Sequence, residues 1–166
     1  MVILRLILHR CNDRRARRKE EIMSEDDNKV LVRRYYDEVL NGGSIDLLEE
    51  LAVADYVEHN PFPGQGNGRN DLEARARLLV TAFNPSRFTI EDIVAEGDRV
   101  VVRWTSTGTH SGEFMGIPPT GRSFTIDGID IHAVRNGRMA EHWHVVDQLG
   151  QMQQLGLIPQ PDTADA

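Results

Sequence analysis

Apolar side chains in the first half of the chain recur at helical spacing. Residues 24–40 place them every three or four positions, behind an N-cap candidate, Ser24, and acidic first-turn residues. The run Asn41-Gly42-Gly43 ends this helix, Ser44 caps a short second helix, and residues 71–83 again have helical spacing and composition. An extended segment at 54–61 and a glycine- and proline-rich stretch at 61–68 separate the second and third helices. The first half therefore predicts three helices.

From residue 87 onward the pattern changes to the alternation typical of β-strands. Strands are predicted over residues 88–95, 100–109, 123–134 and 138–146, with turns at 96–98 and 136–137 that make two hairpins. A long connection covers 110–121, and residues 147–157 form a closing turn or short helix. Helices followed by strands predict an α+β fold, in which a curved sheet covered by the three helices encloses a pocket.

Length and composition predict one domain over residues 23–159. The chain has 166 residues, 40% of them hydrophobic, and compact domains of roughly 100 to 200 residues bury a substantial core. The single cysteine, Cys11, excludes an intramolecular disulfide and a cysteine-based metal cluster.

Residues 1–22 contain seven Lys or Arg and three Asp or Glu, and we interpret them as a basic leader outside the fold. Met23 is a hypothetical natural start, and the rival interpretation is an arm for an acidic partner; residues 160–166 are expected to be a loose tail.

The formal net charge of -7 argues against one class of partner. It disfavours attraction to a phosphate backbone, so no nucleic-acid partner is expected. No stretch reaches the roughly 20 apolar residues that a membrane-spanning helix needs. The apolar start of the chain is split by Arg5 and lacks a small-residue cleavage site, which argues against secretion. We expect a cytoplasmic protein without a membrane partner.

Four of the six histidines and both tryptophans lie between residues 104 and 144, and the register of the last hairpin decides which of them meet. A two-residue turn at 136–137 sets Asp130 opposite Trp143, whereas a three-residue loop at 135–137 sets Asp130 opposite His142. We favour the second because it separates polar from apolar side chains cleanly. The polar face then carries Asp130, His132, His142 and His144, and the other face carries Ile129, Ile131, Ala133, Met139, Trp143 and Val145.

Asp130 and His144 form the candidate acid-base dyad. A carboxylate beside an imidazole orients the ring and favours its protonated form, so that the ring exchanges protons near neutral pH. The alternatives are a structural hydrogen-bonded pair and, since three histidines accompany one carboxylate, a zinc or iron site. His-x-His on one strand is a weak metal signal, so no metal or other cofactor is expected.

Several other residues are candidates for the substrate-binding set. His59 and Asn60 end the extended segment, where loops deliver polar groups to a cavity mouth, although a turn that bonds its own backbone explains them equally well. The apolar candidates from the long connection and strands wall the pocket or pack its turn, and Asp147 either bonds a pocket imidazole or caps the closing segment. The substrate-binding set is His59, Asn60, Trp104, Phe114, Met115, Ile117 and His132.

Four segments of the sequence carry a family resemblance. They are Tyr56-Val-Glu-His-Asn-Pro61, Gly112-Glu-Phe-Met-Gly-Ile-Pro-Pro-Thr-Gly121, Arg135-Asn-Gly-Arg-Met-Ala-Glu-His-Trp-His144 and Gln153-Gln-Leu-Gly156. Over residues 24–159 the chain resembles the SnoaL-like polyketide cyclases and predicted ester cyclases of the nuclear transport factor 2-like superfamily. The resemblance implies a cone-shaped, barrel-like curved mixed sheet covered by three N-terminal helices, often dimeric. It also implies cofactor-free acid-base closure of a polyketide ester by an intramolecular aldol reaction.

The chain departs from this family at the catalytic pair. In the characterised cyclases an aspartate on the last strand is the acid-base residue, and that position is His144 here, while the nearby family histidine falls on Asp130. The resemblance then implies that His144, oriented by Asp130, deprotonates a carbon next to a carbonyl, with His142 or His59 bonding the enolate.

Other functions stay open on the sequence alone. One is a noncatalytic protein that binds a small apolar carbonyl compound, and another is an isomerase or an epoxide hydrolase on the same fold. An epoxide hydrolase usually relies on an Asp-Arg-Asp arrangement, and the strand positions that face the pocket supply Asp130 but no central arginine. The apolar face that carries Trp143 and Val145 favours a homodimer.

Overall fold

The first helix of the protein begins where the sequence predicts. The structure, a computed structural model, describes residues 24–159, so the predicted leader, the hypothetical start at Met23 and the predicted tail lie outside the described residues. Helix α2 (Glu25–Arg34) continues into a wider π-helical turn, Tyr35–Leu40. The Ser24 hydroxyl accepts a hydrogen bond from the Asp27 backbone N–H, and the Asp27 carboxylate accepts one from the Ser24 backbone N–H. The predicted N-cap is confirmed.

The remaining helices are short except for one. A 3₁₀ turn (Ile45–Leu47) leads into α3 (Leu48–Leu51), α4 spans Arg69–Ala82, and α5 spans Gln148–Gln154. Asp147 caps α5 by accepting a hydrogen bond from the Gly150 backbone N–H at 2.8 Å, which is the second of its two predicted roles. Among residues 24–159, no helix has both the length and the apolar character that crossing a bilayer requires.

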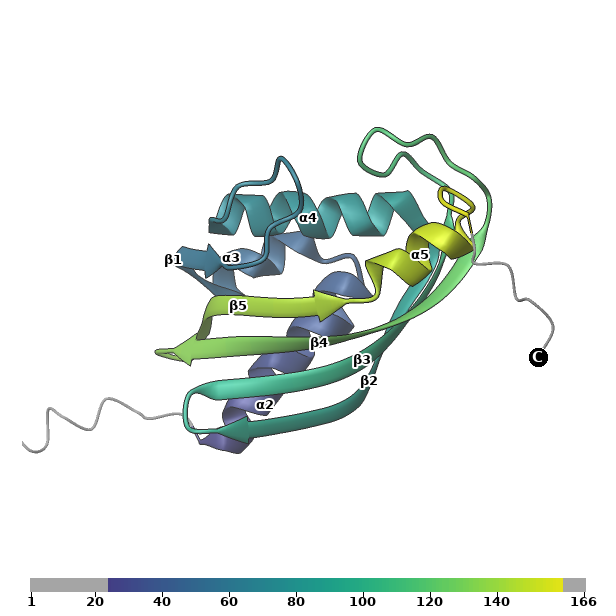
Figure 1. Cartoon of the computed structure of the whole chain (residues 1–166). Coiled ribbons are helices and arrows are strands. Elements are labelled where there is room, and N and C mark those ends of the chain that lie inside the picture. The colour runs from purple at the N-terminus through teal and green to yellow at the C-terminus, as the bar shows by residue number, and fades with distance from the viewer. Residues whose placement is uncertain (1–23, 160–166) are drawn as a thin grey trace, which may run out of the picture.

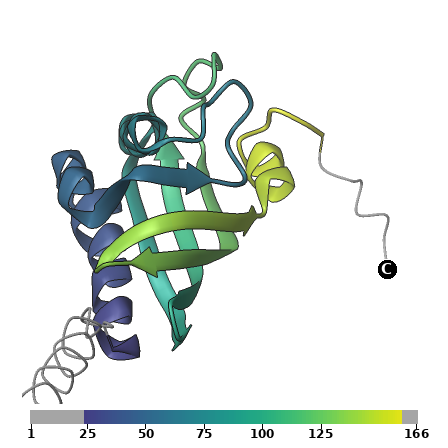
Figure 2. The same ribbon diagram turned by 90° about the vertical axis from the view of Figure 1, so that its left-hand side faces the viewer.

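The described residues form one five-stranded sheet in the order β1-β5-β4-β3-β2. Its strands are β1 (Ala52–Glu58), β2 (Phe83–Glu96), β3 (Arg99–His110), β4 (Ser123–Arg135) and β5 (Arg138–Val146). All neighbours are antiparallel except β1 and β5. The sheet curves around α2 and α4 without closing, and α5 covers one end (Figures 1 and 2). The predicted α+β class, curved mixed sheet and three N-terminal helices are confirmed.

The β1 strand is the element that sequence analysis did not predict. We expected residues 54–61 to be an extended loop, but β1 pairs in parallel with β5 at the edge of the sheet. A parallel neighbour requires a long crossover, and here the crossover contains α4 and three strands, so no local pattern signals the pairing. The strand carries Glu58 to the middle of β5.

The last hairpin has a register that differs from the one we favoured. Its turn has two residues, Asn136 and Gly137, both with positive φ (53° and 72°), and Arg135 pairs with Arg138. A bulge at Ala140 then inserts one residue into β5, so Asp130 pairs with His144 instead of His142 or Trp143.

The bulge also changes which residues share a face. It turns Met139 into the core, whereas the predicted outer residues Ile129 and Val145 are 48% and 75% exposed. The predicted polar face is formed, since Asp130, His132 and His142 are buried on the inner side with His144 beside them. The exposed apolar side chains on the outer face of the sheet, which include Ile129 and Val145, are consistent with a homodimer. The homodimer stays a prediction.

Candidate active site

A mostly apolar cavity lies between the inner face of the sheet and the helices. Its volume is about 70 Å³, small beside the roughly 300 to 1,000 Å³ of drug-sized ligand pockets, so a polycyclic ligand requires the side chains at its mouth to move. Aromatic rings from the strands, the loops and the π-helical turn form a large part of its wall, together with aliphatic side chains. The polar side chains that line it are Arg75, Ser86, Ser106, Asp130, His142, His144, Gln148 and Gln151.

An outer recess of about 360 Å³ adjoins this cavity. The two share Phe62, His144, Val146 and Gln148, and the recess adds Asn60 and the prolines beside it. His144 therefore lies at the junction between the apolar interior and the surface.

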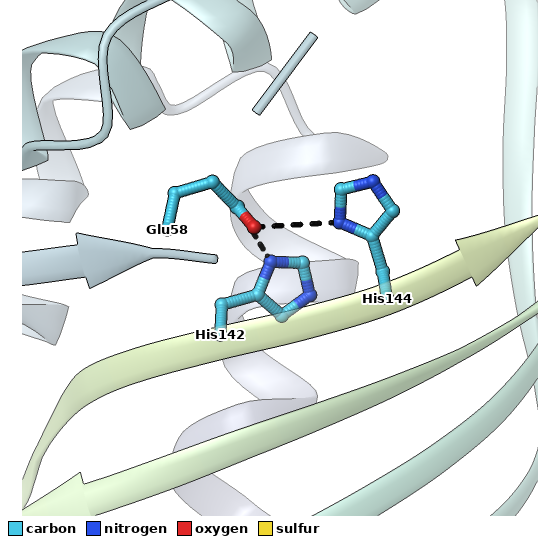
Figure 3. Close-up of side chains that lie close together, drawn as sticks. All are labelled: Glu58, His142 and His144. Atoms are coloured by element: carbon cyan, nitrogen blue, oxygen red, sulfur yellow. Dashed lines mark hydrogen bonds and ion pairs between the residues drawn. The ribbon is translucent and has the colours of Figure 1, made fainter. Parts of the chain in front are cut away.

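Pairing of β1 with β5 brings a carboxylate to the two histidines of β5. Glu58 and His142 are Cα partners, and the Glu58 Oε2 atom lies 2.7 Å from His142 Nδ1. His144, two residues further along the same face, has its Nδ1 atom 3.5 Å from Glu58 Oε1. Figure 3 shows both imidazoles projecting from β5 toward the Glu58 carboxylate at the end of β1. The carboxylate thus bridges a buried ring and a ring at the cavity mouth.

Helix α4 contributes a buried cation to the same cluster. The Arg75 Nη1 atom lies 3.0 Å from Glu58 Oε2, and its two Nη atoms lie 3.4 Å from His144 Nδ1 and His142 Nδ1. The Arg75 side chain is only 6% exposed. A buried arginine of this kind persists because a carboxylate pairs with it, so Glu58 and Arg75 hold each other in the ionised state.

A second carboxylate lies on the far side of His142. Asp130 Oδ2 is 3.5 Å from His142 Nε2 and accepts a hydrogen bond from the Tyr36 hydroxyl of the π-helical turn. His132 completes this group: its Nε2 atom lies 3.2 Å from the Tyr36 hydroxyl, and its ring stacks on His142 with centroids 4.6 Å apart. The His142 imidazole is thereby held between two carboxylates.

Burial and neighbouring charges shift the pKa values of three side chains in the cluster. Burial alone lowers the pKa of His142, but the carboxylates of Asp130 and Glu58 outweigh it and raise that pKa above its usual value. Burial alone raises the pKa of Glu58 and of Asp130, yet hydrogen bonds and charges from neighbouring cations hold both far below their usual values. The cluster therefore contains two ionised carboxylates and a cationic Arg75, and both carboxylates favour the protonated form of His142.

Comparison with known proteins shows the family. The chain matches the SnoaL-like polyketide cyclase family over residues 30–155. It belongs to this family. It is 32% identical over 133 residues to the aklanonic acid methyl ester cyclase DnrD of Streptomyces peucetius, covering 76% of this chain and 88% of DnrD. The nogalonic acid methyl ester cyclase of Streptomyces nogalater is 29% identical over 126 residues, covering 74% and 92%.

Solved structures agree with this SnoaL-like assignment. TsrD from Streptomyces laurentii superposes with a TM-score of 0.74 at 29% sequence identity, covering 82% of this chain and 99% of TsrD. IdmH from Streptomyces antibioticus superposes with a TM-score of 0.68 at 34% identity, covering 78% and 98%. The family resemblance inferred from the four sequence segments is confirmed.

The catalytic residues predicted from sequence are brought together in this SnoaL-like domain, but their contacts differ from our expectation. We expected Asp130 to orient His144. Although the two are Cα partners, the carboxylate within 3.5 Å of the His144 ring is Glu58, whereas Asp130 contacts Tyr36 and His142. Asp130 and His144 therefore belong to two separate pairs, Asp130 with His142 and Glu58 with His144, and the contact between His142 and Glu58 links the pairs.

Only part of the predicted substrate-binding set lines the cavity. Trp104 and Phe114 do, and Asn60 lines the outer recess, where its Oδ1 atom accepts a hydrogen bond from the His144 backbone N–H. Met115, at the loop tip, is 38% exposed and has a positive φ of 52°, and Ile117 bridges to Phe114 without lining the cavity. His132 is buried behind His142 and does not line the cavity either.

His59 lies away from the cavity. Its ring stacks on Trp143 with centroids 4.2 Å apart, and its Nε2 atom lies 2.9 Å from Glu141. Glu141 and Trp143 are near neighbours of His142 along β5, and Trp143 points to the opposite face. Because successive residues of a strand point to opposite faces, a histidine one residue after Glu58 is directed away from the cluster.

Three side chains of the polar cluster were not predicted from the sequence, namely Glu58, Arg75 and Tyr36. Glu58 has the same parity as the buried Tyr56, so alternation within residues 52–58 was an available signal. Arg75 lies in the apolar stripe of α4 with Leu72 and Ala76, where a charge is unusual. The hydroxyl of Tyr36 had no such signal, because a tyrosine on an apolar helix face is typical of a core.

The alternative of a metal centre fits this site poorly. One set of ligand types is Glu58, His142 and His144, but the Arg75 guanidinium already lies within 3.4 Å of all three and would repel a metal cation. The other set pairs Asp130 with His132 and His142, whose rings stack at 21°. Imidazole lone pairs lie in the ring plane, so stacked rings direct them side by side instead of toward one ion.

The buried His132 predicts a pH dependence of stability. Burial and the neighbouring His142 cation lower the pKa of His132 to about 3. Between pH 6.5, the approximate pKa in the unfolded chain, and pH 3, the unfolded chain binds a proton that the folded protein does not. The free energy of unfolding therefore decreases as the pH is lowered through this range. We expect His132→Gln to reduce this slope by up to about 1.4 kcal/mol per pH unit. Denaturant unfolding at pH 7, 6, 5 and 4 measures it, and parallel curves for the two proteins would contradict the prediction.

Proposed function

We propose that this protein is a cofactor-independent acid-base enzyme that closes a ring in an apolar carbonyl compound by an intramolecular aldol reaction, as a polyketide ester cyclase does. The observation that carries the proposal is the place of His144: its ring meets both the apolar cavity and the outer recess, with Glu58 and Arg75 behind it. The relatives described as methyl ester cyclases support the reaction class.

In the proposed mechanism His144 is the proton acceptor. The Nδ1 atom of His144 lies near both an acceptor, Glu58 Oε1 at 3.5 Å, and a donor, Arg75 Nη1 at 3.4 Å. The mechanism uses the tautomer in which Nδ1–H donates to Glu58, so that the Nε2 atom carries a free lone pair and takes a proton from the carbon next to a carbonyl. The resulting imidazolium is stabilised by the Glu58 carboxylate. The roles of Asp130 and Glu58 thus differ from the sequence-based mechanism, in which Asp130 oriented His144.

Arg75 and His142 supply the positive charge that the enolate needs. Both line the cavity, both are buried, and preorganised charges in a low-dielectric environment stabilise a developing oxyanion strongly. Asp130 keeps His142 protonated from its other side. The enolate carbon then attacks a second carbonyl of the same molecule, a C–C bond forms, and the new alkoxide takes the proton back from His144 Nε2, so no net proton is consumed.

Proton exchange at carbon tests this proposal directly. Methyl esters of aromatic β-keto acids are incubated with the protein in deuterated buffer, and loss of the acidic C–H signal is followed by NMR. We expect exchange faster than in buffer alone for at least one compound that also binds. If compounds bind but none exchanges faster, the ring-closure proposal fails, and noncatalytic binding and epoxide hydrolysis are left.

Epoxide hydrolysis is the second candidate function. Arg75 supplies a buried arginine next to one carboxylate, Glu58, with a second carboxylate, Asp130, across His142. The sequence predicted no central arginine for an Asp-Arg-Asp arrangement on the strands that face the pocket, but Arg75 of α4 supplies one. Incubating a panel of apolar epoxides in ¹⁸O-labelled water and detecting labelled diols by mass spectrometry distinguishes this activity, because ring closure incorporates no water.

A further inference from the structure

Among the described residues, three buried polar side chains on the sheet wall of the cavity, Trp104, Asp130 and His142, have an atom that makes no hydrogen bond. The His142 Nε2 atom faces the Asp130 Oδ2 atom at 3.5 Å as an ion pair, which leaves one atom each on Trp104 and Asp130. Within residues 24–159, the Nε1 atom of Trp104 and the Oδ1 atom of Asp130 have no partner. The two residues are 4% and 6% exposed, and both line the cavity. Buried polar atoms are nearly always paired, and leaving them unpaired is costly. Their presence together indicates a partner that enters the cavity.

The two side chains are neighbours on adjacent strands. Trp104 of β3 pairs with Gly128 of β4, and Asp130 is the next inward-facing position along β4. A Cβ atom on Gly128 would lie 2.2 Å from the Trp104 Cζ2 atom and 2.6 Å from Cε2, so the indole lies against the β4 backbone where a side chain is absent. The indole ring therefore lies against β4, the strand that carries Asp130 two residues further along the same face.

The hydrogen-bonding capacities of the pair are complementary. The indole N–H of Trp104 only donates, and an ionised carboxylate only accepts. The Oδ2 atom of Asp130 is already engaged by Tyr36 and faces His142, which leaves Oδ1 as the spare acceptor. A ligand carbonyl matches Trp104 alone, whereas a hydroxyl accepts from Trp104 and donates to Asp130.

We propose that Trp104 and Asp130 form a subsite that binds a hydroxyl group of the ligand, a phenol or an alcohol. The inference rests on the proposed function in taking the cavity as the substrate site, and it narrows the substrate class to hydroxylated carbonyl compounds. The hydroxyl lies against the sheet wall, and the reacting carbon faces His144 at the mouth. Gly128 is a positioning residue, since it lets the indole reach β4.

Binding of a naphthalene series tests the subsite without any need for turnover. The probes are 1-naphthol, 1-methoxynaphthalene, 1-naphthylamine and naphthalene, with Kd measured by calorimetry. 1-Methoxynaphthalene accepts but cannot donate, and the amine donates but accepts poorly, so each probe serves one half of the subsite. We expect 1-naphthol to bind about 10- to 100-fold more tightly than naphthalene, with the other two between them.

Two variants assign the preference to this pair. Trp104→Phe keeps an aromatic ring but removes the donor, so the preference for 1-naphthol over naphthalene is expected to fall about tenfold. Gly128→Ala, which pushes the indole off β4, is expected to lower the preference for 1-naphthol over naphthalene as well. It is the second test of the subsite if Trp104→Phe does not fold. Equal binding of naphthol and naphthalene, absence of naphthol binding, or an unchanged preference in both variants overturns the proposal.

The binding series also separates this inference from the proposed function. Hydroxyl preference without proton exchange at carbon means that the subsite stands and the cyclase-like activity fails. Proton exchange without hydroxyl preference means that the cyclase-like activity stands and the hydroxyl subsite fails.

Discussion

The His144→Ala variant is expected to lose proton exchange at carbon by about 10²- to 10⁴-fold, the contribution typical of a positioned general base. Ligand affinity should change little, since the apolar walls of the cavity stay intact. The change removes a ring whose Nδ1 atom is fixed by Glu58 and whose other side meets the cavity. Exchange rates by NMR and Kd values by calorimetry, measured on the same compound, separate the two effects.

The matched control is His59→Ala. His59 is also a histidine near β5, but its ring stacks on Trp143 on the opposite face, so exchange should stay within about threefold of wild type, far from the loss expected of a general base. If His144→Ala retains wild-type exchange, His144 is not the base. If both variants lose exchange equally, the loss comes from a general disturbance of β5.

Glu58→Gln is expected to have the largest effect on stability. The change leaves the buried Arg75 cation and His142 without the carboxylate that both contact, at 3.0 Å and 2.7 Å. Removing one partner of a buried ion pair costs about 3–5 kcal/mol, because the other charge stays buried and unpaired. Urea unfolding at pH 7 measures the loss of free energy. We also expect proton exchange to fall, since His144 loses the group that orients it.

A double-mutant cycle assigns the stability effect to the pair. Arg75→Gln removes the cation, and in the Glu58→Gln/Arg75→Gln double variant no unpaired charge remains from this ion pair. The double variant should therefore be destabilised by clearly less than the sum of the two single variants. Strict additivity, or a Glu58→Gln variant within about 1 kcal/mol of wild type, contradicts the buried ion pair.

The local pattern of the sequence determined the elements of this protein. Periodicity and turn residues located the three N-terminal helices, the two hairpins and the Ser24 cap, because each depends on side chains a few positions apart. Alternation also assigned Asp130, His132, His142 and His144 to one face correctly. The four motif segments identified the SnoaL-like family.

Tertiary structure decided which of these side chains meet. The bulge at Ala140 adds one residue to β5, and a single inserted residue leaves no mark on a short alternating pattern, so the hairpin register was wrong although the shared face was correct. Glu58 joins His142 through a parallel pairing of strands more than 80 residues apart, and Arg75 arrives from a helix that crosses above them. Such contacts depend on long-range packing, which sequence periodicity does not encode. The sequence by itself therefore determined the fold class and the polar strand face, and only the packing of β1 and α4 against β5 created the charged cluster around His144.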